Sequence, residues 1–254
     1  MRVFTILLAA LFLIAPVLSA CDAPPAGPAP LSVQADTLNT EWAVEWWLPR
    51  HKQKLKDKDK QKVDLIVLGD SITHGWEGEG EAVWDEYFAP RNGFNLGFGG
   101  DRTENVLWRL DNGAVDGLSP KLVILMIGTN NTGHRMDSVE DTVAGINAIL
   151  KKLKQKLPAT DILLLGIFPR GATPDDPARL RNQQINRRLK ANAVNRKWQR
   201  KHANVHYRDI GSIFVGDDGV ISETIMPDLL HLSPEGYRLW AEVIEADVAR
   251  IMAD

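Results

Sequence analysis

Serine, histidine and aspartate side chains stand in turns of this sequence where they could take part in nucleophilic catalysis. Ser71 ends a Gly-Asp-Ser tripeptide directly after the apolar run Val63–Leu68, and His231 lies three residues after Asp228. A serine hydroxyl is a poor nucleophile until a base removes its proton, and an imidazole held by a carboxylate is such a base. An ordinary turn followed by a helix N-cap is the alternative interpretation, because Asp and Ser are favoured at both.

Short apolar runs alternate with segments of helical periodicity along the chain. Strands are predicted at residues 63–68, 94–97, 122–127, 162–167 and 205–207. Helices are predicted at residues 103–110, 139–157 and 179–200, and again after Ser233-Pro234. This alternation indicates a parallel sheet with helices on both faces. We therefore predict an α/β fold, a single three-layer α/β/α domain around a five-stranded parallel, flavodoxin-like sheet.

The carboxyl ends of parallel strands meet at one edge of a sheet, so residues that follow different strands converge there. Ser71, Gly100 and Asn130 each follow a predicted strand, and Asp228 and His231 precede the last helix. In type, order and spacing these residues resemble the four sequence blocks of the SGNH hydrolases, which are also called the GDSL esterase and lipase family.

The resemblance implies a serine esterase with a Ser-His-Asp mechanism. Ser71 is then the nucleophile, His231 the general base and Asp228 the residue that orients the histidine ring. Ile72 stands where the family name has a leucine, and Ile72 and Leu230 flank the nucleophile and the base. Both are candidates for an acyl pocket, and core packing is the alternative for both.

The resemblance also implies an oxyanion hole for the tetrahedral intermediate. The backbone N–H groups of Ser71 and Gly100 and the side-chain amide of Asn130 would donate to the oxyanion. Gly97 and Gly99 are alternatives to Gly100, because all three glycines belong to one turn.

A closer resemblance is to the catalytic subunits of intracellular platelet-activating-factor acetylhydrolase. It is carried by Asn95–Asp101, Val106–Leu110 and Gly128–Asn131, and the family resemblance as a whole spans about residues 62–252. The closer resemblance implies a homodimer, although no interface signal is evident in the sequence.

The N-terminal region is predicted to be a targeting segment and not part of the fold. Residues 1–20 have the pattern of a signal peptide, and Leu-Ser-Ala-Cys at its end resembles the lipobox of bacterial lipoproteins, with Cys21 as the lipidated residue. Residues 21–34 form a Pro/Ala-rich tether, and the hydrolase domain is placed at residues 35–254. Cleavage as a plain secretory signal and an uncleaved membrane anchor are the alternatives. The lipoprotein interpretation predicts an envelope protein anchored to a membrane; the secretory one predicts a secreted protein.

A cluster of tryptophans precedes the first strand. Trp42, Trp46 and Trp47 are expected in a short amphipathic helix that ends before Pro49, with a second, Lys-rich helix after it. The cluster is interpreted either as a platform for substrate or as packing against the domain.

Composition argues against several other functions. Charge is nearly balanced, with 30 Lys and Arg against 33 Asp and Glu, so nucleic acid is not an expected partner. His202 and His206 are four residues apart, but Ala203 replaces the glutamate that a zinc-protease motif needs. No metal and no cofactor are therefore expected.

The leading hypothesis is a serine esterase that removes short acyl groups, acetyl above all, from an envelope or extracellular substrate. The main alternative has the same mechanism with a phospholipid or lysophospholipid as substrate. A non-catalytic, flavodoxin-like binding module is a hypothesis of a different class, and an inactive homologue that serves as a scaffold is the last.

Overall fold

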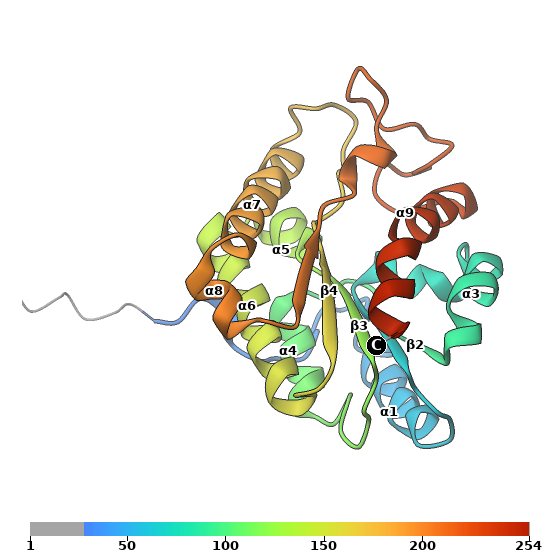
Figure 1. Cartoon of the computed structure of the whole chain (residues 1–254). Coiled ribbons are helices and arrows are strands. Elements are labelled where there is room, and N and C mark those ends of the chain that lie inside the picture. Colours follow the sequence, from blue (N-terminus) through green and yellow to red (C-terminus); the bar gives the residue numbers. More distant parts are fainter. Residues whose placement is uncertain (1–27, 254) are drawn as a thin grey trace, which may run out of the picture.

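A computed structural model describes residues 28–253, which form one parallel sheet between two layers of helices (Figure 1). The strands are β1 (Leu65–Gly69), β2 (Gly93–Gly97), β3 (Leu122–Met126), β4 (Asp161–Leu165) and β5 (Val205–Arg208). They lie in the order β2-β1-β3-β4-β5, and every pair is parallel. The predicted α/β class and flavodoxin-like strand order are thus confirmed.

Apolar side chains of the strands alternate between the two faces of the sheet, and each face has its own helical layer. One face packs against α4 (Thr103–Asp111), α6 (Val139–Lys156) and α7 (Pro177–Ala193). The other packs against α2 (Ser71–His74), α3 (Glu81–Tyr87) and α9 (Pro234–Ala253). Because both faces are covered, every residue of β1 and β3 is buried, as expected for central parallel strands.

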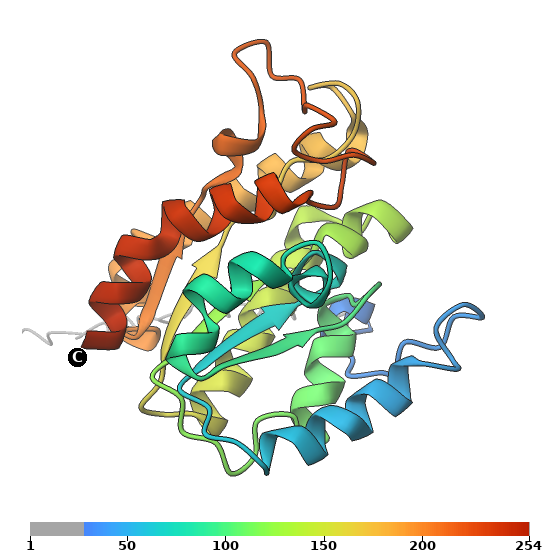
Figure 2. The same cartoon turned by 90° about the vertical axis from the view of Figure 1, so that its right-hand side faces the viewer.

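The remaining elements lie around this framework. They are α1 (Trp47–Lys58), α5 (Thr129–Arg135), α8 (Arg196–Lys201) and four 3-10 turns, at Leu31–Val33, Gly75–Glu77, Ala89–Arg91 and Gly211–Phe214. Figure 2 shows the long connections after β4 and β5 extending beyond the carboxyl edge of the sheet. This edge is the one at which the candidate site residues were expected.

The predicted helix at residues 179–200 is in fact two helices. The side chain of Asn195 caps α8 by accepting hydrogen bonds from its first backbone N–H groups, which separates α8 from α7. Leu180 and Val194 were expected on a buried stripe, but they are 42% and 72% exposed. The stripe of α7 is instead partly polar, with Asn182 and Asn186 buried against the chain that follows β4.

The predicted break at Pro49 is also wrong. Helix α1 begins two residues before Pro49, whose missing N–H is not needed in the first turn of a helix. The residues before Trp47 form turns. Trp47 is fully buried, so this member of the tryptophan cluster packs in the domain, whereas Trp42 is 54% exposed.

Most of the predicted N-terminal features lie outside the described residues, namely the leader at 1–20, Cys21 and the tether as far as residue 27. Ser32 is buried, and its hydroxyl donates a hydrogen bond to the Asp141 carbonyl, 2.6 Å away. This packed segment precedes the predicted domain boundary at residue 35, because a small serine fits between α4 and α6. Within residues 28–253, no helix has the length and apolar character needed to cross a bilayer.

Candidate active site

Ser71 lies where a buried strand turns sharply into a short helix. Strand β1 ends at Gly69, where a Cβ atom would come within 2.4 Å of the Met126 carbonyl oxygen. Asp70 caps the helix by accepting a hydrogen bond from the Ile72 N–H, and Ser71 is the first residue of α2. The close approach of β3 therefore requires glycine before the serine, and the cap directs the chain out of the sheet.

A hydrogen-bonded chain runs from Ser71 through His231 to Asp228. The Ser71 hydroxyl lies 2.8 Å from His231 Nε2, and His231 Nδ1 lies 2.6 Å from Asp228 Oδ2. With its proton on Nδ1, the ring donates to the carboxylate and accepts from the hydroxyl. This geometry can transfer a proton from the serine to the histidine.

The turn that carries Asp228 and His231 is held by the aspartate itself. Asp228 Oδ1 accepts hydrogen bonds from the backbone N–H groups of Leu230 (3.1 Å) and His231 (2.7 Å). Burial acts to raise the pKa of Asp228, but these bonds and the one from the His231 ring hold it below its usual value. Leu229 has φ of +60°, a left-handed conformation that costs about 1 kcal/mol in a non-glycine residue.

The glycine turn after β2 leaves one backbone donor free beside this chain. The Gly97 N–H donates to Asn95 Oδ1 (2.7 Å), and the Gly99 N–H donates to His74 Nδ1 (3.3 Å). Among residues 28–253, the Gly100 N–H has no hydrogen-bond partner. Gly100 adopts φ of +76°, which favours glycine. Of the competing glycines, Gly100 is therefore the one with a donor available to a ligand.

Asn130 is tied to the same turn. It is 3% exposed, and its Nδ2 donates one hydrogen bond to the Asp101 carbonyl at 3.0 Å, which leaves its second N–H for a ligand. The Asp101 carboxylate is fully buried and pairs with Arg109, 2.7 Å away. It also accepts a bond of 2.6 Å from Trp47 Nε1. These contacts hold the glycine turn and Asn130 in one arrangement.

The structure thus links Ser71, His231 and Asp228 directly, and it links Gly100 to Asn130 through the neighbouring Asp101. It does not support Ile72 as part of an acyl pocket, because this side chain is 1% exposed and packs in the core. Leu230 is half-buried against the same core.

His74 is a site residue that the sequence reasoning left without a role. It stands three residues after Ser71 in α2, a spacing that places it on the same face of the helix. Burial and the nearby Arg50 lower the pKa of His74 to about 4, so its ring is neutral near pH 7. With Nδ1 accepting from Gly99, the proton is on Nε2, which makes this atom a donor.

His74 also joins two open hollows on the surface. Ser71, His74 and Glu77 line the first, of about 390 Å³. His74, Glu77 and Trp46 line the second, of about 520 Å³. A molecule bound at Ser71 can therefore extend along His74 towards Trp46 and α1.

Replacing Asn130 with alanine is expected to lower kcat on p-nitrophenyl acetate by about a hundredfold to a thousandfold, because one oxyanion donor is lost. Activity and thermal unfolding should be measured together, since the side chain also bonds the Asp101 carbonyl. Asn192→Ala is the control, because that half-buried asparagine of α7 has no side-chain hydrogen bond in the described chain. Unchanged kcat in Asn130→Ala would remove the residue from the oxyanion hole.

Burial raises the pKa of Asp70 to about 7. The folded protein then keeps this proton between about pH 4 and 7, where the unfolded chain has lost it, so this group makes the free energy of unfolding fall as pH rises. Asp70→Asn does not titrate. Relative to the parent, we expect the variant to gain about 2 kcal/mol between about pH 5 and 8, or roughly 4–8 °C in Tm. A difference in Tm that stays constant over this range would contradict the raised pKa.

The fold and this site define the chain as an α/β hydrolase-type enzyme with a serine at the carboxyl edge of its sheet. It belongs to the GDSL-like lipase/acylhydrolase family, whose model matches residues 67–239. It is therefore a carboxylic ester hydrolase, which confirms the family resemblance and displaces the hypothesis of a non-catalytic binding module.

Named relatives agree with this assignment. The human platelet-activating factor acetylhydrolase IB subunit alpha1 is 34% identical over 210 residues, which cover 82% of this chain and 84% of the relative. The rat subunit alpha2 is 36% identical over 191 residues, covering 75% and 78%.

Solved structures share the fold at lower identity. A GDSL-like lipase from Bacteroides thetaiotaomicron has a TM-score of 0.62 at 19% identity, covering 80% of this chain and 97% of that one. A carbohydrate acetylesterase from Sinorhizobium meliloti has a TM-score of 0.57 at 18% identity, covering 75% and 100%.

Proposed function

We propose that this chain is a serine esterase that removes short acyl groups, acetyl above all, from O-esters. The observation that carries the proposal is the hydrogen-bonded chain from Ser71 to His231 (2.8 Å) and on to Asp228 (2.6 Å). It joins a hydroxyl, an imidazole and a carboxylate in the order that nucleophilic acyl transfer requires.

In the proposed mechanism, His231 Nε2 takes the proton of Ser71 as Oγ attacks the ester carbonyl carbon. Asp228 holds the ring and stabilises the imidazolium that forms. The oxyanion accepts hydrogen bonds from the backbone of Ser71 and Gly100 and from Asn130. Return of the proton to the leaving alcohol breaks the ester bond. A water, deprotonated by His231, then attacks the acyl-serine, which releases the acid and restores the hydroxyl.

We infer that the leaving alcohol is carried by a sugar. The hollow that extends from Ser71 contains Trp46, whose ring lies 6.0 Å from the His74 ring, centre to centre. Its charges are compensated, because Arg50 and Lys54 both bind Glu77, at 2.8 and 2.6 Å. An indole face surrounded by balanced polar groups suits a neutral ligand with a flat apolar side and hydroxyl groups.

The first experiment compares p-nitrophenyl acetate, butyrate and octanoate as substrates, with a chelator present. We expect kcat/KM to be highest for acetate and to fall with chain length. Equal or faster turnover of octanoate would overturn the short-acyl proposal. A folded protein without turnover of any ester would favour the inactive scaffold.

The sugar proposal is tested with Trp46→Ala on an acetylated oligosaccharide and on p-nitrophenyl acetate. We expect KM for the oligosaccharide to rise about tenfold, in line with the loss of one stacked aromatic contact, while kcat/KM for the small ester stays within about twofold. Trp46→Phe should restore most of the affinity. Equal losses on both substrates would mean that Trp46 supports the fold and not the sugar.

A phospholipid is the second candidate substrate, and a specific observation favours it. Trp42, Val44 and Leu48 are 54%, 50% and 38% exposed, which gathers apolar side chains near the glycine turn. The relatives named as platelet-activating factor acetylhydrolase subunits point the same way. Faster hydrolysis of a 2-acetyl phospholipid in vesicles than of the acetylated oligosaccharide would select this candidate.

We further propose that the protein is an envelope lipoprotein, held to a membrane through Cys21, and that it forms a homodimer. The lipobox-like sequence before Cys21 supports the first proposal, and the resemblance to the acetylhydrolase subunits supports the second. Detergent partitioning of the parent and of Cys21→Ser, and light scattering of the purified protein, test them in turn.

A further inference from the structure

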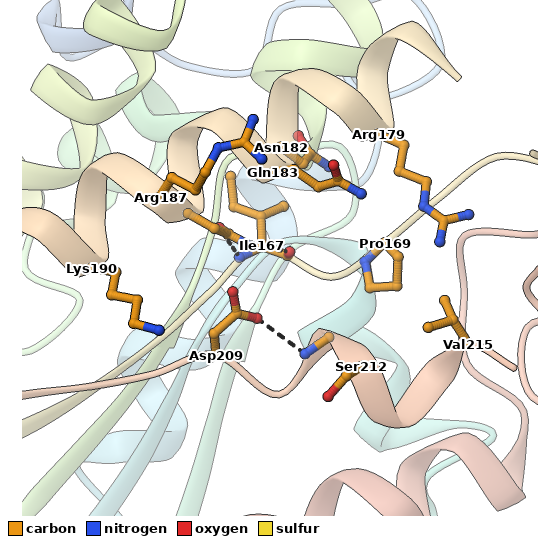
Figure 3. A pocket seen from close by; sticks show the side chains of 12 residues that line it. Ile167, Pro169, Arg179, Asn182, Gln183, Arg187, Lys190, Asp209, Ser212 and Val215 are labelled. Carbon is orange, nitrogen blue, oxygen red and sulfur yellow. Dashed lines mark hydrogen bonds between the residues drawn. The ribbon is translucent and has the colours of Figure 1, made fainter. Parts of the chain in front are cut away.

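A pocket of about 340 Å³ lies apart from the candidate active site, between α7 and the 3-10 turn at Gly211–Phe214 (Figure 3). Ile167 and Pro169, which follow β4, and Asp209, which follows β5, are among its lining residues. None of the residues proposed for catalysis lines it. It is thus a second hollow on the edge where open α/β sheets bind ligands.

Arg179 stands at one end of this pocket with donors that no other group uses. The side chain is 3% exposed, and Figure 3 shows its guanidinium near Pro169 and Val215. Its Nη2 donates to the Gly219 carbonyl at 2.6 Å, but Nε and Nη1 are buried without a partner among residues 28–253. A buried cation with unpaired donors is unfavourable, and an anionic ligand would satisfy it.

The floor of the pocket is rigid and polar. Asn186 binds Ile167 twice, accepting from its N–H and donating to its carbonyl, both at 2.8 Å. Asn182 accepts a hydrogen bond from the Thr132 hydroxyl at 2.7 Å and donates one to the Phe168 carbonyl at 3.4 Å. These amides anchor α7 to the chain after β4, so the pocket is formed in advance and ordering it costs little on binding.

The other polar groups of the wall are available to a ligand. Arg187 and Lys190 line the pocket from α7, and neither has an ion pair in the described chain. Asp209 accepts only the Gly211 N–H (3.1 Å), and the Gln183 amide has no hydrogen bond among these residues. Three cationic side chains and one carboxylate line the pocket, which gives it a formal charge of +2.

We propose that this pocket binds a hydroxylated organic anion of about the size of one sugar ring. Arg179 would pair with the anionic group of the ligand, and Arg187 and Lys190 would add long-range attraction. Asp209 and Gln183 would accept hydrogen bonds from its hydroxyl groups. The anionic group is a carboxylate or a phosphate, which share this chemistry.

Calorimetry on the purified protein tests the proposal with glucuronate, glucose 6-phosphate, inorganic phosphate and glucose as probes. We expect at least one charged sugar to bind at least tenfold more tightly than glucose and fivefold more tightly than inorganic phosphate. The tighter of the two charged sugars identifies the anionic group. Absence of binding by both charged sugars at about 20 mM, or equal affinity for glucose, would overturn the proposal.

Variants assign the binding to this pocket. Arg179→Gln should weaken the charged sugar at least tenfold. Because Arg179 also holds the Gly219 carbonyl, a second variant, Arg187→Gln with Lys190→Gln, changes only exposed side chains and should weaken binding at least fivefold without lowering Tm. Arg188→Gln is the matched control, an exposed arginine of α7 outside the pocket. Parent-like affinity in the first two variants would overturn the proposal, and none of these readouts depends on esterase activity.

Discussion

Ser71→Ala is expected to lower kcat on p-nitrophenyl acetate by about a millionfold, to a rate near that of the free solution. The reason is the contact of 2.8 Å between Ser71 Oγ and His231 Nε2, since without the hydroxyl there is no nucleophile for the histidine to activate. Serine and histidine act as a unit, so Ser71→Ala combined with His231→Ala should be no slower than Ser71→Ala alone.

The fold should tolerate this change, because alanine removes only the hydroxyl and Asp70 still caps α2. Thermal unfolding of the variant within about 2 °C of the parent would separate a catalytic loss from a folding defect. A fluorophosphonate probe provides an independent readout, since it should label the parent and leave the variant unlabelled. Activity that persists in Ser71→Ala would mean that another residue is the nucleophile.

Asp228→Asn is expected to lower kcat by about a thousandfold to ten-thousandfold. The carboxylate accepts from His231 Nδ1 at 2.6 Å, and an amide in its place would no longer stabilise the imidazolium or favour the same tautomer. KM should change little, because Asp228 faces the far side of the ring from Ser71. Steady-state kinetics on the acetate ester measure both values.

The side chain of Asp228 is 56% exposed, so solvent also contributes to stabilising the imidazolium, and the loss should be smaller than for Ser71→Ala. Asp217→Asn is the matched control, because it changes an exposed carboxylate in the same long connection before α9. A loss below about tenfold in Asp228→Asn would mean that His231 is oriented by the local backbone and not by this carboxylate.

Periodicity and turn residues were enough to predict the class of fold and the location of each strand to within two residues. Continuous apolar runs such as Leu122–Met126 occur where both faces of a strand are covered, and Gly-rich turns follow where such strands end. The order of the strands also follows from few choices, because parallel connections are right-handed and short. Local signals were weaker where a single side chain decides the outcome, as Asn195 does between α7 and α8.

The types and order of the candidate catalytic residues were readable from the chain, because each is written into a short local motif: Gly-Asp-Ser, a glycine turn, an asparagine after a strand, and Asp-x-x-His. Distances between motifs are not local. Only the tertiary structure brought His231 within 2.8 Å of Ser71 and selected Gly100, whose N–H is free while those of Gly97 and Gly99 are engaged. The same holds for Trp46 beside His74 and for the unpaired donors of Arg179, because burial and partners depend on residues far away in sequence.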